Sequence, residues 1–150
     1  MSELVHGLDD LVGEWVARRI PAVGTSEGWR PFRAIGVAEG RRLIAGAVFH
    51  AYSGPDIQIS FAAESARWAT RSNIAGILDY PFSIGCSRVT ALCERKNKRV
   101  RKLLEGIGFK MEGVARRGFG RQDAMIYGLL SEDRKFARNH GQKQQSASAA

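Results

Sequence analysis

The stretch of sequence that decides the fold reads NKRVRKLLEGIGF over residues 97–109 and KMEGVAR over residues 110–116. Its apolar residues recur at the three-and-four spacing of one helix face: Val100, Leu103, Leu104 and Ile107. The other face is basic, with Lys98, Arg99, Arg101 and Lys102. Gly106 and Gly108 stand where the C-terminal end of a helix favours a left-handed residue. The stretch therefore predicts an amphipathic helix followed directly by a strand over residues 110–116.

Further strands are predicted around this helix, over residues 88–93 and 123–130. Upstream, residues 56–62 alternate between an apolar face (Ile57, Ile59, Phe61) and a polar face (Asp56, Gln58, Ser60), which is typical of a strand with one buried side. Residues 74–82 have helical spacing, with Ser72 or Asn73 as the cap and with Pro81 expected to end or kink the helix. Because strand, helix and strand follow one another between residues 56 and 93, those two strands are expected to be parallel.

The N-terminal part predicts a helix and a hairpin. One helix is predicted to end at Pro21, and its apolar face contains Leu8, Leu11, Val12, Trp15, Val16 and Ile20. Residues 32–38 and 43–49 are strand-like runs joined through Glu39-Gly40, and no strand is assigned before the helix. The expected class is α/β (α+β), with a mixed, mostly antiparallel twisted sheet that has one central parallel strand pair and is flanked by helices. Residues 1–138 are expected to form a single domain, and residues 139–150 a disordered tail.

Composition excludes several classes of protein. No apolar run reaches the roughly 20 residues of a membrane span, and no export signal is recognisable, so we expect a cytoplasmic protein without a membrane partner. Cys86 and Cys93 are expected to be reduced and buried. The histidines His6, His50 and His140 are far apart in the sequence, and no cysteine stands near any of them at ligand spacing, so no metal site is predicted.

The net charge of +8 is concentrated in residues 94–121, where ten basic residues face three acids. Such a patch suits an anion, which would be the phosphates of a cofactor, a nucleic acid or an acidic partner. The alternative is a solvated helix face that only aids solubility, and on charge alone this is the preferred interpretation.

One sequence order consists of Asn97, an apolar helix, Gly108-Phe109, Glu112-Gly113 and Arg116, and it is completed by a strand-like run over residues 124–130. This order resembles the end of the GNAT superfamily of N-acetyltransferases. The branch that looks most similar contains the ribosomal-protein N-terminal acetyltransferases. The resemblance implies an enzyme that transfers an acetyl group from acetyl-CoA to a primary amine, which is a protein N-terminus, a lysine or a small molecule.

The resemblance also implies where acetyl-CoA lies, namely between the two central parallel strands, with its pyrophosphate on the loop after the first of them. The family's loop motif, Arg/Gln-x-x-Gly-x-Gly/Ala, falls on residues 67–72, where Arg67 fits but Thr70 and Ser72 replace the small residues. The cofactor residues implied in this way are Phe61, Ala62, Ala63, Arg67, Trp68, Ala69, Thr70, Arg71, Ser72, Asn73, Asn97 and Arg101. Asn97 suits a helix N-cap equally well, and the stretch from Arg67 suits an ordinary basic helix start.

Catalysis by this route needs a neutral amine, and therefore a proton acceptor. Asp56 is the first candidate base, acting directly or through water, although it also suits a plain turn residue after Gly54-Pro55. Glu64 is the second candidate, and His50 and Tyr127 are less favoured. Many relatives have a tyrosine that protonates the departing thiolate; its position is Leu104 here, so that acid is missing.

Two alternatives stay open beside the enzyme. One is a GNAT-fold protein that has lost catalysis and serves as a binding domain, which the glycine-poor loop and Leu104 permit. The other is a nucleic-acid-binding module, which is disfavoured because no aromatic residues are interleaved with the basic ones. A homodimer is compatible with the sequence.

Overall fold

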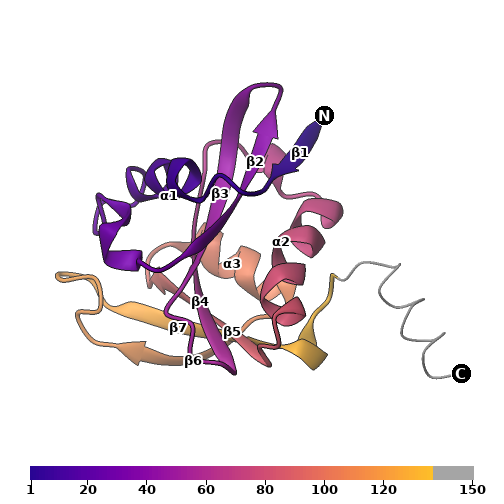
Figure 1. The fold of residues 1–150 in the computed structure, drawn as a ribbon. Coiled ribbons are helices and arrows are strands. Elements are labelled where there is room, and N and C mark those ends of the chain that lie inside the picture. The colour runs from indigo at the N-terminus through magenta and orange to yellow at the C-terminus, as the bar shows by residue number, and fades with distance from the viewer. Residues whose placement is uncertain (137–150) are drawn as a thin grey trace, which may run out of the picture.

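The computed structural model describes residues 1–136 and shows one seven-stranded sheet (Figure 1). Its strands are β1 (Ser2–Val5), β2 (Arg33–Glu39), β3 (Arg42–His50), β4 (Asp56–Ala63), β5 (Arg88–Glu94), β6 (Lys110–Ala115) and β7 (Ala124–Leu130). Their order in the sheet is β1-β2-β3-β4-β5-β7-β6. Only β4 and β5 are parallel, and all other neighbours are antiparallel. The predicted mixed sheet with one central parallel pair is therefore confirmed.

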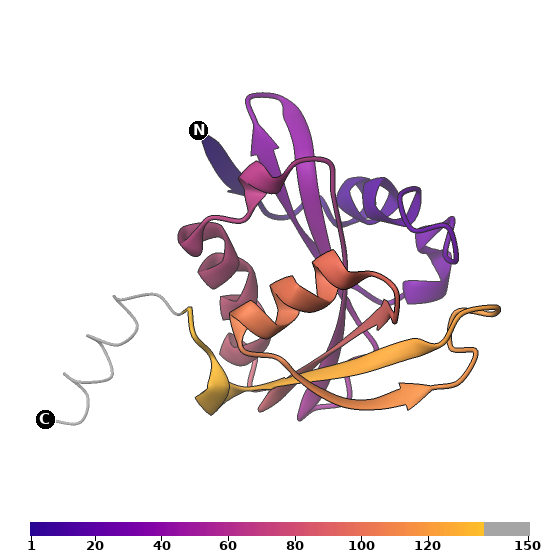
Figure 2. The same cartoon turned by 180° about the vertical axis from the view of Figure 1, so that it is seen from behind.

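Helices cover both faces of this sheet. The described residues form the α-helices α1 (Asp9–Ala17), α2 (Arg71–Ser83) and α3 (Lys98–Ile107) and the short 3₁₀ helices η1 (Ser26–Trp29), η2 (Ala66–Trp68) and η3 (Ser131–Asp133). One core cluster joins α1 and η1 to β2 and β3, whereas the larger cluster joins α2 and α3 to the central strands. Figure 2 shows α2 and α3 together on the side away from α1.

Helix α1 packs directly over two paired glycines of the sheet, Gly36 and Gly46, which leave room for its valines. Val12 and Val16 are fully buried against them. The predicted apolar face is only partly correct, since Leu8 and Leu11 are more than half exposed. The helix starts at Asp9 and has only nine residues, and the strip that meets the sheet contains Val12 and Val16 and leaves Leu11 on the outer side.

The start of α2 differs from the prediction. Its N-cap is Thr70, whose hydroxyl oxygen accepts a hydrogen bond from the Asn73 N–H at 3.1 Å, so neither Ser72 nor Asn73 is the cap. The Asn73 side chain is instead buried and donates to the Ser2 hydroxyl and to the Trp68 carbonyl oxygen. The helix also continues two residues beyond Pro81, to Ser83, because a proline in the last turn removes only one backbone hydrogen bond.

The ends of α3 agree with the prediction. The Asn97 side-chain oxygen accepts a hydrogen bond from the Val100 N–H at 3.2 Å, which makes it the N-cap, and Gly108 follows the helix with a φ of +123°. A strand that was not predicted, β1, pairs with β2 at the edge of the sheet. Its four residues are too few for a recognisable alternation of apolar and polar residues.

Two cysteines, Cys86 and Cys93, are free and buried, as predicted. None of the described helices is long and apolar enough to cross a membrane. The predicted disordered tail, residues 139–150, lies outside the described residues.

Candidate active site

The two parallel strands separate from each other at their C-terminal ends. Their paired residues run from Asp56 and Arg88 to Ile59 and Ala91. Beyond that point β4 continues along β3 as far as Ala63, whereas β5 continues along β7 as far as Glu94. The four residues from Ser60 to Ala63 therefore line an opening in the sheet, about 13 Å long at the usual rise per residue, which we call the splay.

Backbone groups of β4 point into the splay. The Glu64 N–H donates to the Ile44 carbonyl oxygen of β3 at 2.8 Å. Because successive residues of a strand direct their amides to opposite sides, the amides of Phe61 and Ala63 point away from β3. The β4–β5 ladder has already ended there, so these amides have no partner strand within the described residues. They are the donors that a ligand in the splay would meet.

The loop that follows β4 leads to the start of α2. Trp68 is buried and its ring lies 4.4 Å from that of Phe61, so this tryptophan fills the core under the loop. The remaining side chains that were predicted in this loop lie at the surface: Arg67, Ala69, Thr70, Arg71 and Ser72. The Asn73 N–H is already bonded to the Thr70 hydroxyl oxygen, so the N–H groups of Arg71 and Ser72 are the ones at the start of α2 that favour an anion.

The two arginines of the loop differ in their partners. Arg67 donates two hydrogen bonds to the Glu39 carboxylate, at 2.6 and 3.0 Å. Arg71 forms no ion pair with the described residues, and its guanidinium lies 5.1 Å from the centre of the Phe136 ring. Arg71 is therefore the cation of this loop that is available to a phosphate.

Arg101 on α3 faces the interior and is already bonded. It donates to the Tyr127 hydroxyl at 3.0 Å and to the Arg95 carbonyl oxygen at 2.9 Å. Tyr127 is fully buried and its hydroxyl donates to the Glu105 carboxylate at 3.1 Å. This network joins β7 to α3 beside the splay.

Asp56 lies at the closed end of the β4–β5 pair, on the face of the sheet that α1 partly covers. Thr90 donates from its hydroxyl to the Asp56 carboxylate, with oxygens at 2.9 and 3.0 Å, and Arg88 donates at 3.3 Å. Arg88 also donates to the Glu112 carboxylate at 2.8 Å. Arg88, Thr90 and Glu112 were not predicted as site residues, because their association depends on strand order in the sheet.

Glu64 lies at the other end of β4, directly after the strand. Its carboxylate accepts hydrogen bonds from Arg19, two residues after α1, and from Arg42 of β3 at 2.8 Å. These hydrogen bonds lower the pKa of Glu64, which makes its carboxylate a weaker base.

A hydrogen-bonded pair, His50 and Ser60, lies at the inner end of the splay, between these two carboxylates along β4. His50 Nε2 and Ser60 Oγ are 2.8 Å apart, and the His50 ring stacks on Trp29 of η1 with 5.5 Å between ring centres. Burial lowers the pKa of His50 to about 4. His50 was predicted only as a less favoured base and Trp29 was not predicted, since nothing local to either residue signals their contact.

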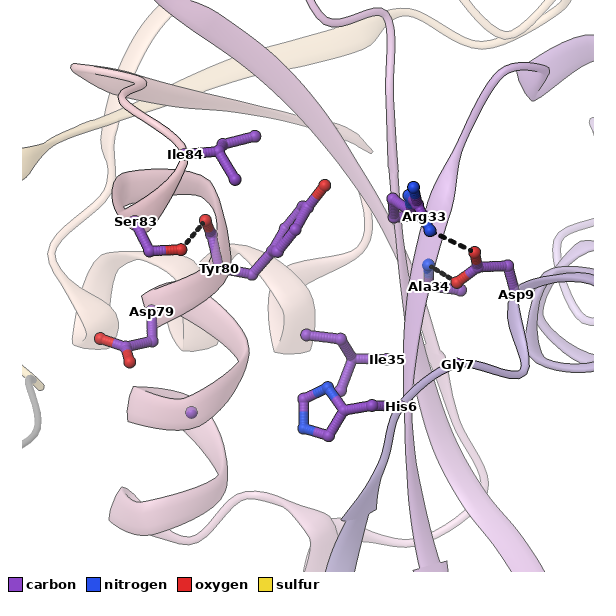
Figure 3. Close-up of a pocket in the computed structure, with 11 residues that line it drawn as sticks. His6, Gly7, Asp9, Arg33, Ala34, Ile35, Asp79, Tyr80, Ser83 and Ile84 are labelled. Atoms are coloured by element: carbon purple, nitrogen blue, oxygen red, sulfur yellow. Dashed lines mark hydrogen bonds and ion pairs between the residues drawn. The ribbon is translucent and has the colours of Figure 1, made fainter.

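A cavity of about 560 Å³ lies elsewhere, between α2 and the start of β2 (Figure 3). Its lining includes His6, Asp9, Arg33, Ile35 and Tyr80. Arg33 begins β2, which runs in the same direction as β4, so this cavity lies at the end of the sheet away from the splay. It shares no residue with the predicted site.

No family model and no curated protein matches the sequence. Solved structures with the same fold are nevertheless numerous. The ribosomal-protein-S18-alanine N-acetyltransferase of Escherichia coli superposes with a TM-score of 0.69, over 92% of this chain and 96% of its own, at 14% identity. A spermidine/spermine N-acetyltransferase of Vibrio cholerae gives 0.70, over 88% and 96%, at 14% identity. The IAA acetyltransferase of Bacillus cereus gives 0.74, over 87% and 99%, at 8% identity.

These neighbours act on different acceptors according to their names, but their fold is common to them and to this chain. The resemblance predicted from residues 97–116 is thereby confirmed at the level of the fold: the chain has the fold of the GNAT acetyltransferases.

Proposed function

We propose that the protein transfers an acetyl group from acetyl-CoA to a primary amine. The observation that carries this proposal is the splay, where two parallel strands separate and, among residues 1–136, leave the Phe61 and Ala63 amides without a partner strand, next to the start of α2. An extended thioester arm fits such an opening, because it takes over the hydrogen bonds that a neighbouring strand would otherwise make.

The cofactor residues fall into three groups in this proposal. Phe61, Ala62 and Ala63 line the splay, and one of the inward-pointing amides donates to the thioester oxygen as negative charge develops there. The phosphates bind at the start of α2, where the N–H groups of Arg71 and Ser72 and the Arg71 guanidinium meet them. Asn97 and Arg101 act indirectly, by capping and anchoring α3 beside the splay.

The acceptor amine approaches from the face that carries α1, where Asp56, Ser60 and the partly exposed Leu92 lie. The thioester occupies the splay itself, so an amine that attacks it must come from one face of the sheet, and α2 and α3 cover the other. The acceptor is a protein N-terminus, a lysine or a small amine, and labelled acetyl-CoA added to a cell lysate, followed by mass spectrometry, would distinguish these.

Calorimetric titration with acetyl-CoA tests the proposal directly. We expect heat of binding and a raised unfolding temperature, because a ligand that binds only the folded state stabilises it. An absence of both at millimolar acetyl-CoA would contradict the proposal. Binding without turnover would indicate a binding domain that has lost catalysis. Salt-dependent RNA binding without acetyl-CoA binding would instead favour the basic nucleic-acid module.

Asp56 as the base, directly or through water, is a separate prediction. Asp56→Asn keeps the size of the side chain and removes its basicity. If Asp56 accepts the proton, turnover falls by about 10²–10⁴-fold while acetyl-CoA affinity is unchanged, and the loss becomes smaller at high pH, where more amine is neutral. Near-normal turnover across the pH range would exclude this role.

A further inference from the structure

The hydrogen-bonded pair of His50 and Ser60 lies where a reacting thioester would end. Ser60 is the first residue of β4 beyond the last β4–β5 pair, Ile59 and Ala91. A thioester arm that enters the splay from its open end, beside α2, has its acyl group at the inner end. The inner end is at Ser60, and the acyl carbon therefore lies next to the Ser60 side chain.

We propose that Ser60 and His50 form a proton relay for acetyl transfer, with Ser60 in contact with the reacting amine and His50 acting through it. This inference rests on the proposed function. In the required tautomer His50 carries its proton on Nδ1, and the Ser60 hydroxyl donates to Nε2. The remaining lone pairs of Ser60 Oγ are then free to accept an N–H of the incoming amine.

The step balances within these groups. The neutral amine attacks the thioester carbon and forms the C–N bond, and its nitrogen passes a proton to Ser60 Oγ while the Ser60 proton moves to His50 Nε2. The C–S bond then breaks, and the departing thiolate takes a proton back from His50 by the reverse path. The products are the amide and CoA with its thiol protonated, and the enzyme returns to its starting state.

Two features of the structure support this relay over the carboxylates. His50 is held in place by the Trp29 ring and is neutral at physiological pH, because burial lowers its pKa to about 4. A neutral imidazole has a free lone pair on Nε2 that can accept the Ser60 proton, whereas an imidazolium could not accept it. Asp56, in contrast, already accepts hydrogen bonds from Thr90 and Arg88.

The position of Trp29 is itself determined by a specific contact. The Glu14 carboxylate of α1 accepts hydrogen bonds from the Ser26 N–H at 2.9 Å and from the Ser26 hydroxyl at 2.8 Å. Ser26 begins η1 and is buried, so this contact fixes η1 against α1 and Trp29 against His50.

Single variants of the relay test it. His50→Gln places an amide near the position of Nε2, so it keeps a hydrogen-bonding group for Ser60 but cannot take up a proton. We expect kcat to fall by about 10²–10⁴-fold in His50→Gln and in Ser60→Ala, with an unchanged KM for acetyl-CoA. Ser60→Thr, which keeps the hydroxyl, should recover much of the activity. His6→Gln, the same change at an exposed histidine far from the splay, should leave kcat unchanged.

Acetyl-CoA affinity and unfolding temperature, measured on each variant, separate loss of the relay from loss of the fold. Wild-type kcat in a folded His50→Gln variant would overturn the relay and leave acetyl transfer intact. An acetyl group found on Ser60 by mass spectrometry would overturn it in favour of a covalent intermediate. A wild-type protein that neither binds acetyl-CoA nor acetylates an amine would overturn the proposed function together with the relay.

Discussion

At the scale of single residues, the charged side chains around the splay differ mainly in whether they already form an ion pair. Arg67 and Arg71 both lie at or just before the start of α2, where we propose that the phosphates bind, and Glu39 holds Arg67 through two hydrogen bonds. These hydrogen bonds raise the pKa of Arg67 and lower that of Glu39. A phosphate would have to compete with Glu39 for Arg67 but not for Arg71.

Alanine variants of these two arginines should therefore differ. We expect Arg71→Ala to weaken acetyl-CoA binding by about 1–3 kcal/mol, the usual size of a hydrogen bond to a charged group, and Arg67→Ala to weaken it less. Titration with a CoA fragment that lacks the pyrophosphate is the control, because neither variant should alter its affinity. Equal affinity of both variants and the wild type for acetyl-CoA would place the phosphates elsewhere.

The lowered pKa of Glu64 predicts how the stability of the protein depends on pH. Hydrogen bonds from Arg19 and Arg42 lower its pKa below 4.5, so the folded protein holds the proton less tightly than the unfolded chain. The resulting stabilisation is present above pH 4.5 and is lost as the pH falls through the folded-state pKa. Glu64→Gln should lower the unfolding temperature at pH 7 and reduce its decline between pH 5 and 3, as followed by circular dichroism.

The same Glu64→Gln protein tests the second candidate base. If its turnover equals that of the wild type, Glu64 does not accept the substrate's proton. If turnover falls while the fold and acetyl-CoA affinity are retained, the carboxylate has a catalytic role in spite of its two arginine partners.

At the scale of elements, the close approach of α1 to the sheet depends on glycine. A Cβ atom at Gly46 would lie 2.7 Å from Val16 Cγ2 and 3.0 Å from Val12 Cγ1, which is closer than carbon atoms pack. Helix α1 would have to move away, and its contact with η1 and Trp29 would be disturbed. The helix and the site are thus coupled through one small residue.

We expect Gly46→Ala to lower the free energy of unfolding by about 1–3 kcal/mol, the usual cost of overpacking. Gly106→Ala is a matched control within α3, because nothing lies within 4 Å of a Cβ there and the position is helical. That variant should raise the free energy of unfolding by about 0.4–1 kcal/mol through the smaller entropy of the unfolded chain. Denaturation with urea measures both, and a neutral Gly46→Ala would show that α1 is free to adjust.

At the scale of the whole molecule, the splay separates only the C-terminal ends of β4 and β5, which are paired before it. On one side of it lie β1 to β4 with α1, and on the other lie β5, β7 and β6. A ligand in the splay would add hydrogen bonds to β4 where its ladder with β5 has ended.

Hydrogen exchange should detect the hydrogen bonds that a ligand in the splay makes with β4. We expect the amides of Phe61 and Ala63, which point into the splay, to exchange slowly only when acetyl-CoA is bound. The Ala62 amide points toward β3 and should be protected with and without the ligand. Unchanged exchange at Phe61 and Ala63 in the presence of bound acetyl-CoA would show that the thioester arm does not lie along β4.

Much of the fold could be predicted because it depends on local periodicity. The alternation in residues 56–62 and the helical spacing of Val100, Leu104 and Ile107 are visible to a reader of the sequence, since each element has to bury one face. Gly108 and Asn97 mark the ends of α3 for equally local reasons, namely a left-handed backbone and a cap. The order of these elements was enough to predict the mixed sheet with its parallel pair.

What only the tertiary structure decided is which side chains meet. The contacts around the site join residues from different strands and loops, so they depend on strand order and register. They are the contacts of Glu39 with Arg67, of Asp56 with Arg88, and of His50 with Trp29 and Ser60. Likewise, the point where β4 leaves β5 follows from the different neighbours of the two strands. The sequence determines the elements because burial acts on adjacent residues, whereas charge pairing and the splay arise between residues that only folding brings together.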